Sequence, residues 1–252
     1  MTILSERSKQ PEELDDGTVD TATYNRVLAE LAVINRLTVT HGPTLRWLAR
    51  ATKDLPVGAT FSALDVGYGH GDLLRAIARW ARRRGLHARL SGIDLNPRSA
   101  VAAREATPEG MSIDYRTGDV FSYTPSEPVD FIVSSQFAHH LSGQELVEFL
   151  AWIDRTAVRG WHIADLHRHA LAYCCFPVLA TLAGWHRITR CDGAISIARS
   201  FRRQEWRSYL DAANVLADVS WHLPFRLCVS RDKTTYATVI EKEQSSPVPV
   251  RR

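Results

Sequence analysis

The sequence predicts an open α/β domain in which a mostly parallel, seven-stranded sheet is doubly wound, with helices on both faces. Two observations predict this fold. From residue 61 onward, short apolar runs alternate with segments of helical periodicity. The chain has 252 residues, 45% of them hydrophobic, which is enough for one sizeable core but not comfortably for two. The final strand is expected to be antiparallel.

The elements are expected in a defined order. Apolar residues recur at helical spacing over residues 23–53 and are interrupted at His41-Gly42-Pro43, which predicts two helices ahead of the sheet. The predicted strands are residues 62–66, 88–94, 112–117, 129–134, 158–165, 217–223 and 234–241. The predicted helices are residues 72–84, 97–106, 143–156, 171–185 and 204–214.

This order divides the chain into segments. Residues 1–18 and 241–252 lack periodicity and are expected to be flexible tails, residues 19–55 an N-terminal helical cap, and residues 56–240 the main domain. Residues 166–199 are expected to be an insertion that forms a lid. The reason is that residues 171–185 are apolar and aromatic and follow the fifth strand, at the edge where open α/β sheets bind ligands.

Composition excludes several classes of protein. With 31 basic and 28 acidic residues, the formal charge is only +3 and gives no argument for a nucleic-acid partner. The four cysteines form no CxxC pair, which indicates reduced thiols. No leader for export and no membrane-spanning stretch is found, so a cytoplasmic protein is expected.

A glycine-rich turn follows the first predicted strand. Gly67, Gly69 and Gly71 stand at alternate positions, and Asp72 occupies the place where a dinucleotide-binding loop needs its third glycine. A carboxylate at Asp65, near the end of the strand, would repel a pyrophosphate but attract an ammonium group. The turn therefore favours a cationic ligand over NAD.

Two further acids follow the next two predicted strands. Asp94 ends the second strand, where its carboxylate can accept hydrogen bonds from ribose hydroxyls, and Asn96 is suited to cap the helix after it. Asp119 follows the third strand and can accept a hydrogen bond from an adenine amino group, while Val120 packs on the ring. Acids at three consecutive strand ends indicate a nucleoside site.

This ordered set, over about residues 61–165, resembles the class I S-adenosylmethionine-dependent methyltransferases. Within them it is similar to the small-molecule group typified by the ubiquinone and menaquinone enzymes. The resemblance implies an enzyme with a Rossmann-like fold and S-adenosyl-L-methionine as cofactor. It also implies methyl transfer to a small acceptor, with an aromatic or lipophilic molecule and O-methylation favoured. The expected cofactor-binding residues are Asp65, Gly67, Tyr68, Gly69, Gly71, Asp94, Leu95, Asp119, Val120, Ser135 and Gln136.

Candidate catalytic groups follow the fourth and fifth strands. His139 and His140 are adjacent, so on a helix their side chains point about 100° apart and only one readily faces the site. Asp165 and His167 would share one face if the fifth strand continues, and a histidine held by an aspartate is a competent base near neutral pH. All four are predicted as catalytic, while a purely structural role for each of them stays open.

No metal site is predicted. The suitable ligand types near these strands are His139, His140, Asp165, His167 and His169, but they contain no HExxH-like pair. Two other functions stay open: a regulatory protein that binds the cofactor without catalysis, and an NAD-dependent oxidoreductase, which Asp65 and Asp72 disfavour. The expected partner is a small-molecule substrate rather than nucleic acid or a membrane, and the sequence is compatible with a homo-oligomer.

Overall fold

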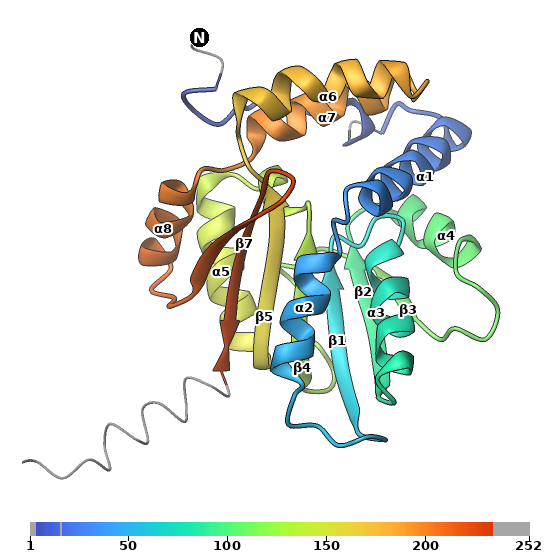
Figure 1. The fold of residues 1–252 in the computed structure, drawn as a ribbon, viewed down its shortest axis with the longest axis vertical. Helices are drawn as coiled ribbons and strands as arrows, with labels where there is room; N and C mark the ends of the chain where they lie inside the picture. The colour runs from blue at the N-terminus through green and yellow to red at the C-terminus, as the bar shows by residue number, and fades with distance from the viewer. Residues whose placement is uncertain (1–3, 16, 234–252) are drawn as a thin grey trace, which may run out of the picture.

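The computed structural model describes residues 4–15 and 17–233 of the chain (Figure 1). Its core is a seven-stranded sheet with the order β3-β2-β1-β4-β5-β7-β6. The strands are β1 (Thr60–Val66), β2 (His87–Asp94), β3 (Asp114–Thr117), β4 (Val129–Ser135), β5 (Ala157–Leu166), β6 (Asp218–His222) and β7 (Arg226–Asp232). The first five pair in parallel, and β7 is antiparallel to both of its neighbours. The predicted fold class is confirmed.

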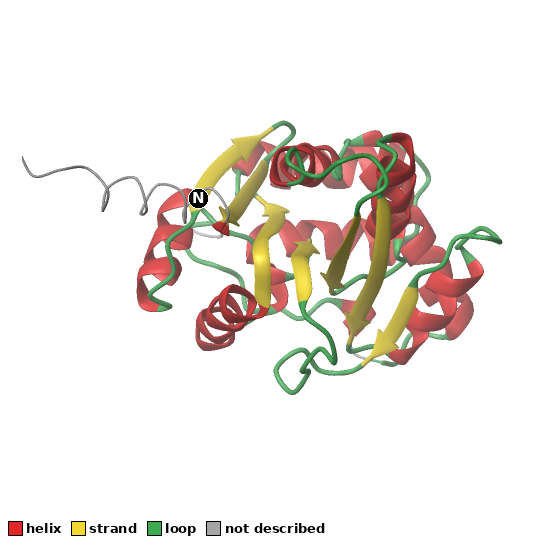
Figure 2. Cartoon of the chain, turned by 90° about the horizontal axis from the view of Figure 1, so that it is seen from below, coloured by secondary structure: helices red, strands yellow, loops and turns green. Residues whose placement is uncertain are grey.

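Helices cover both faces of this sheet, as the view in Figure 2 shows. The helices are α1 (Thr21–Leu37), α2 (Gly42–Ala51), α3 (Asp72–Arg83), α4 (Pro97–Glu105), α5 (Gly143–Thr156), α6 (Ala170–Leu182), α7 (Arg187–Arg199) and α8 (Arg203–Ala212), with short 3-10 helices η1 (Glu13–Asp15) and η2 (Ala138–His140). On one face, Trp47 of α2 and Ile77 of α3 pack with Phe61. On the other, Phe149 of α5 and Trp206 of α8 pack with the sheet. These two cores hold the strand ends in fixed positions.

The last strand differs from its predicted position. The predicted range 234–241 lies outside the described residues, and the strand that pairs with β6 is β7, immediately after a turn at Pro224 and Phe225. Leu227, Cys228 and Val229 are all buried because the strand is covered on both faces. Such a strand shows no alternation of apolar and polar residues, which is why periodicity missed it.

The N-terminal segment also differs from the expected flexible tail. The guanidinium of Arg7 donates to the carbonyl oxygens of His139, Leu141 and Arg199. Glu12 is only 7% exposed. The segment therefore packs against η2 and α7 because its polar groups find long-range partners there. The second expected tail, residues 241–252, lies outside the described residues. No described helix has the length and apolar character needed to cross a membrane.

The carboxyl ends of the parallel strands face a helical layer. Figure 1 shows α6 and α7 side by side across the end of the sheet at which β5 ends, with α1 beside them. This helical pair comes from residues 170–199, within the segment expected to be an insertion. The same edge carries the glycine loop, so the fold places the N-terminal helices and the inserted helices around one site.

A buried histidine under α2 should make stability depend on pH. The His162 ring lies against Trp47, and its Nδ1 is 3.2 Å from the hydroxyl oxygen of Thr44. Burial, with nearby His222, Arg50 and Arg46, lowers the pKa of His162 from 6.5 to about 3. In the unfolded chain His162 binds a proton below pH 6.5. In the fold it stays neutral until about pH 3, so acid favours unfolding throughout this window.

We expect the free energy of unfolding of the wild type to fall with decreasing pH by about 1.4 kcal/mol per unit more than that of His162→Gln over this window. Urea unfolding followed by tryptophan fluorescence at several pH values measures the difference. Parallel pH profiles for the two proteins would contradict the assignment of a neutral buried imidazole.

Candidate active site

The glycine loop lies between the end of β1 at Val66 and the start of α3 at Asp72. Gly71 has φ +73°, and a Cβ there would be 2.5 Å from the hydroxyl oxygen of Tyr115, so only glycine fits. Gly69 has φ +50°, and no atom lies within 4 Å of the place where its Cβ would be. The backbone at Gly69 is therefore open to a ligand.

Asp65 lies beneath this loop and is 1% exposed. Its Oδ1 is buried and has no hydrogen-bond partner among the described residues. Burial, and then the negative charges of Asp72 and Asp94, raise the pKa of Asp65 well above its ordinary value. A buried carboxyl oxygen without a partner is costly unless a cation or donor reaches it, so this atom points to a cationic group of a ligand.

Asp72 differs from Asp65 because its pKa is lowered rather than raised. Its Oδ2 accepts hydrogen bonds from Asn35 Nδ2 at 3.0 Å and lies 2.9 Å from His41 Nε2. Burial would raise the pKa of Asp72, but His41 and Asn35 outweigh burial and lower it to about 2. Asp72 is thus an ionised group next to Asp65. Sequence reasoning did not assign Asp72 or His41 to the ligand site, because the contact joins segments distant in the sequence.

Asp94 fixes the shape of the loop. Its two carboxyl oxygens accept hydrogen bonds from the backbone N–H groups of Gly69 and Asn96, both at 2.9 Å. Burial raises the pKa of Asp94 despite these two hydrogen bonds. Asp119, by contrast, is exposed and accepts a hydrogen bond from the backbone of Phe121 at 3.0 Å. Asp94 is the last residue of β2, and Asp119 lies two residues after the end of β3, as the sequence predicted.

A cavity of about 110 Å³ lies between the glycine loop and α1. Its lining residues are Leu28, Leu31, Asn35, His41, Asp65, Gly67, Tyr68, Gly69, His70, Asp72, Leu73, Ser135 and Gln136. Six of the predicted cofactor-binding residues are among them. The other five, Gly71, Asp94, Leu95, Asp119 and Val120, lie outside the lining. Since ligand pockets usually exceed about 300 Å³, this cavity can hold only part of a nucleoside ligand.

A chain of hydrogen bonds closes one side of the cavity. Gln136, at φ +55°, donates from Nε2 to Asn35 Oδ1 at 2.6 Å and accepts from Arg226 Nη1 at 3.1 Å. Arg226 is 4% exposed and also donates to Thr40 Oγ1 at 2.6 Å. The chain therefore links β7, β4 and α1, and it continues through Asn35 to Asp72. Arg226 was missed in the sequence because its strand was not predicted.

His139 and Asp165 form a buried pair. His139 Nδ1 is 2.8 Å from Asp165 Oδ1, and the backbone N–H of His139 donates to Oδ2 of the same carboxylate at 3.0 Å. Burial would lower the pKa of His139, but the charges and hydrogen bonds of Asp165 and Glu12 outweigh it and raise that pKa. The same pairing lowers the pKa of Asp165 against the effect of burial. Asp165 thus orients His139 rather than His167.

His140 has a different environment. Its side chain is 28% exposed, and Nδ1 lies 2.9 Å from Asp15 Oδ2. Its Nε2 is directed at Glu12, with 3.9 Å between Nε2 and Oε1. The two adjacent rings lie 4.4 Å apart between centroids, so both reach the same carboxylate. The expectation that the two side chains diverge is wrong here, because the short helix η2 and the N-terminal segment hold both rings against Glu12.

His167 lies outside this group. β5 ends at Leu166, and the backbone N–H of His167 donates to the carbonyl of Phe225. Its Nδ1 is buried without a hydrogen-bond partner among the described residues. Burial and the neighbouring His169 lower the pKa of His167. His169 caps α6 by accepting from the backbone of Leu171. The expected pairing of His167 with Asp165 is therefore wrong.

The inserted helices present few apolar side chains to the sheet. In α6, Leu179 and Leu182 are 60% and 80% exposed. Phe176 instead packs on α7, where a Cβ at Gly193 would lie 2.1 Å from its ring. The apolar face expected to cover a ligand is thus divided between solvent and the contact with α7.

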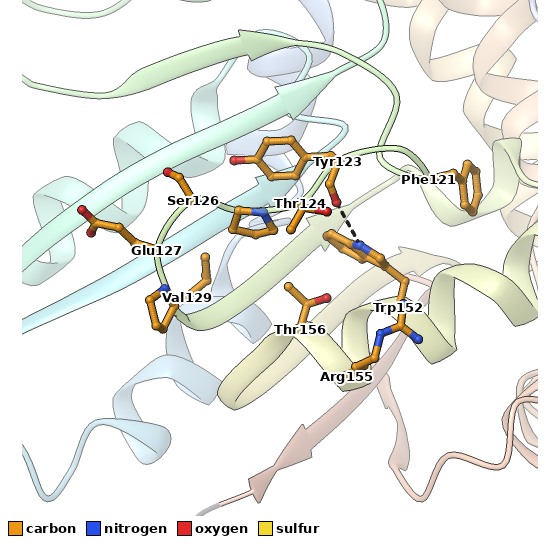
Figure 3. Close-up of a pocket in the computed structure, with 11 residues that line it drawn as sticks. Phe121, Tyr123, Thr124, Ser126, Glu127, Val129, Trp152, Arg155 and Thr156 are labelled. Carbon is orange, nitrogen blue, oxygen red and sulfur yellow. Dashed lines mark hydrogen bonds between the residues drawn. The ribbon is translucent and has the colours of Figure 1, made fainter.

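A larger hollow of about 430 Å³ lies at the opposite edge of the sheet (Figure 3). It lies where β4 begins and α5 ends, and the indole of Trp152 donates to the carbonyl of Tyr123 at 3.3 Å. Its charged lining residues are Glu127 and Arg155. It lies far along the strands from the glycine loop, and none of the residues predicted as catalytic lines it.

Known proteins resemble this chain over its central part. Residues 63–160 match a family model described as a methyltransferase domain. Trans-aconitate 2-methyltransferase of Streptomyces coelicolor is 35% identical over 111 residues, which are 42% of this chain and 34% of that protein. The chain thus spans about a third of the length of the curated relatives it matches.

Solved structures share the fold at lower identity. Magnesium protoporphyrin IX methyltransferase from Synechocystis PCC 6803 with bound S-adenosylhomocysteine (SAH) has a TM-score of 0.52 at 16% identity, over 85% of this chain and 88% of that one. A plantazolicin methyltransferase, in complex with SAH and a monoazolic analogue, has a TM-score of 0.60 at 12% identity, over 81% and 88%. Residues 63–160 are therefore similar to a methyltransferase domain, and the chain shares its fold with these methyltransferases.

Proposed function

We propose that this protein transfers the methyl group of S-adenosyl-L-methionine to an oxygen of a small aromatic or lipophilic acceptor. The observation that carries the proposal is the buried Oδ1 of Asp65, which has no hydrogen-bond partner in the part of the chain that the structure describes. Asp65 lines the same cavity as Gly69, where the backbone is open. An α-ammonium group of the cofactor would satisfy this oxygen. The NAD-dependent alternative is disfavoured because the ionised Asp72, and Asp65 once it has lost its proton, would repel a pyrophosphate.

Residues at the ends of the second and third strands are proposed to contact the rest of the cofactor. In this proposal Asp94 accepts hydrogen bonds from the ribose hydroxyls, and the segment of Asp119 and Val120 contacts adenine. When bound, S-adenosylmethionine supplies an electrophilic methyl group on a sulfonium. The protein's task is to hold an acceptor oxygen in line with that methyl group and assist loss of the hydroxyl proton, as the O–CH₃ bond forms and the S–CH₃ bond breaks.

Of the four residues predicted as catalytic, His140 is our candidate for activating the acceptor hydroxyl. It follows the strand whose end residues Ser135 and Gln136 line the cavity, and its side chain is the most exposed of the His139, His140 and Asp165 group. His139 and Asp165 are positioning residues in this proposal because both are fully enclosed. His167 is not given a role.

Turnover tests the function directly. The protein is incubated with S-adenosylmethionine and a panel of phenols, hydroxylated apolar acids and trans-aconitate, and SAH formation is followed by mass spectrometry. Acceptor-dependent SAH formation with a methylated product supports the proposal. Binding of SAH without turnover of any acceptor would favour the regulatory alternative, and saturable NAD(H) binding without a response to SAH would overturn the proposal.

Replacing Asp94 should weaken cofactor binding. Asp94→Ala removes the proposed ribose acceptor and the hydrogen bond that holds Gly69. We expect the free energy of SAH binding to become less favourable by about 1–3 kcal/mol, measured by isothermal titration calorimetry. Asp114→Ala is the matched control, because Asp114 is an exposed acid on the neighbouring strand. Equal SAH affinity in wild type and Asp94→Ala would remove the assignment.

Cofactor binding should also depend on pH through Asp65. The raised pKa of Asp65 means that its proton must leave before the carboxylate can pair with the ammonium group. SAH affinity should therefore rise with pH, by up to about tenfold per unit below that pKa, with release of a proton. Calorimetry in buffers of different ionisation enthalpy counts that proton. Asp65→Asn should bind more weakly and lose this dependence, and identical pH profiles in the two proteins would contradict the pairing.

A further inference from the structure

Three ligand-type side chains from two distant segments meet near η2. Glu12 Oε1 is 3.5 Å from His139 Nε2 and 3.9 Å from His140 Nε2. The donor atoms of all three residues lie within 4.8 Å of one another. Glu12 and His139 are 7% and 2% exposed. Two imidazoles and a carboxylate form one of the common donor sets of catalytic zinc and of non-haem iron.

Each imidazole is oriented by a second carboxylate. His139 Nδ1 lies 2.8 Å from Asp165, and His140 Nδ1 lies 2.9 Å from Asp15. If each Nδ1 carries a proton and donates it to its carboxylate, each Nε2 presents its lone pair toward Glu12. Histidines that bind metals through one nitrogen usually donate the other N–H to a carboxylate in this manner.

The glutamate is also held in place. Ser196 of α7 donates to Glu12 Oε1 at 2.8 Å. The carboxylate of Asp192 accepts the backbone N–H groups of Glu13 and Leu14, both at 3.0 Å, and so fixes the turn that follows Glu12. Arg7 and Arg199 donate to backbone carbonyls of residues 139–141 rather than to these carboxylates. The cluster therefore keeps its three donor atoms free of arginine.

The charges around the cluster favour a cation. Glu12, Asp15 and Asp165 contribute three carboxylates against two imidazoles. Even with both rings protonated, the five side chains carry a net negative charge when all three acids are ionised. A dication coordinated by neutral imidazoles would compensate these acids in a largely buried place, where unpaired charge is most costly.

We propose that Glu12, His139 and His140 bind a divalent transition metal of the zinc, iron or manganese class. Ligands about 2.0–2.1 Å from a tetrahedral zinc ion are about 3.3 Å apart. The separations of 3.5 and 3.9 Å from Glu12 Oε1 therefore need to shorten by roughly 0.2 and 0.6 Å. The partly exposed His140 can make this adjustment. Magnesium is a poor match because it prefers oxygen ligands. The site was not predicted from the sequence because Glu12 lies in a segment that was expected to be a flexible tail.

A catalytic role for this metal rests on the proposed function, in which the ion would help to activate the acceptor hydroxyl. Three protein ligands leave a coordination position for water or for the acceptor oxygen, as in catalytic zinc sites. His140 then activates the acceptor as a ligand of the ion, which lowers the pKa of the bound hydroxyl. The hydroxyl proton passes to solvent, and the oxygen takes the methyl group as the S–CH₃ bond breaks.

Cobalt binding tests the site without any need for activity. The full chain is freed of metal with a chelator and titrated with Co²⁺, whose visible absorption reports nitrogen coordination, and calorimetry with Zn²⁺ gives the stoichiometry. We expect one ion per chain in wild type and about tenfold or more weaker binding in Glu12→Gln and in His140→Gln. Glu13→Gln, the same substitution at the partly exposed neighbour that pairs with Arg187, should bind as wild type does.

Two outcomes would overturn the metal site. One is the absence of a stoichiometric ion in wild type, and the other is equal Co²⁺ binding in Glu12→Gln, His140→Gln and wild type, which would place the ion at other histidines. Circular dichroism and thermal unfolding in the presence of chelator show whether each variant folds. If either Glu12→Gln or His140→Gln fails to fold, the Co²⁺ affinity of the other variant tests the site. SAH binding to the metal-free protein is measured in parallel, so failure of the metal site is distinguished from failure of the cofactor site.

Discussion

Burial of negative charge at the carboxyl edge of the sheet is the constraint on which the rest of the site depends. Parallel pairing aligns Asp65 on β1 with Gly92 on β2 and Val133 on β4, so the strands end together and their acids gather at one edge. Asp65 and Asp165 are almost fully enclosed there. A carboxylate removed from water must be neutralised, hydrogen-bonded or paired with a cation. The surrounding elements can be understood as different solutions to this requirement.

Neighbouring helices and loops supply most of these solutions. Asp72 is compensated by α1 and by His41, and Asp165 by His139, so both keep a lowered pKa despite burial. Asp94 accepts hydrogen bonds from the backbone N–H of Gly69 in the glycine loop and from that of Asn96. Asp65 is the exception, because its raised pKa and its Oδ1 without a partner show that the described chain provides no compensating group. In the proposed function, the ammonium group of the cofactor is the cation that compensates Asp65.

Local patterns predicted the parts of the molecule that depend on nearby residues. Short apolar runs and the alternate glycines located β1, the loop and the acids at the strand ends, because strand and turn propensities act over a few residues. Contacts between residues far apart in the sequence could not be predicted from such local patterns. Glu12 and His139, and Arg226 and Gln136, are far apart in the sequence and lie in contact only in the folded chain. Buried on both faces, β7 gave no alternating pattern.

The proposed reaction needs a cofactor site and an acceptor site, and different parts of the chain contribute to them. The residues matched by the methyltransferase-domain model, 63–160, hold the glycine loop, Asp94 and η2. Glu12, Asn35 and Arg226, which complete the polar surroundings of that edge, all lie outside it. Cofactor binding can therefore be shared with proteins whose flanking segments differ. In the proposed reaction, acceptor choice would depend on side chains that reach the edge from the N-terminal segment, α1 and the last strands.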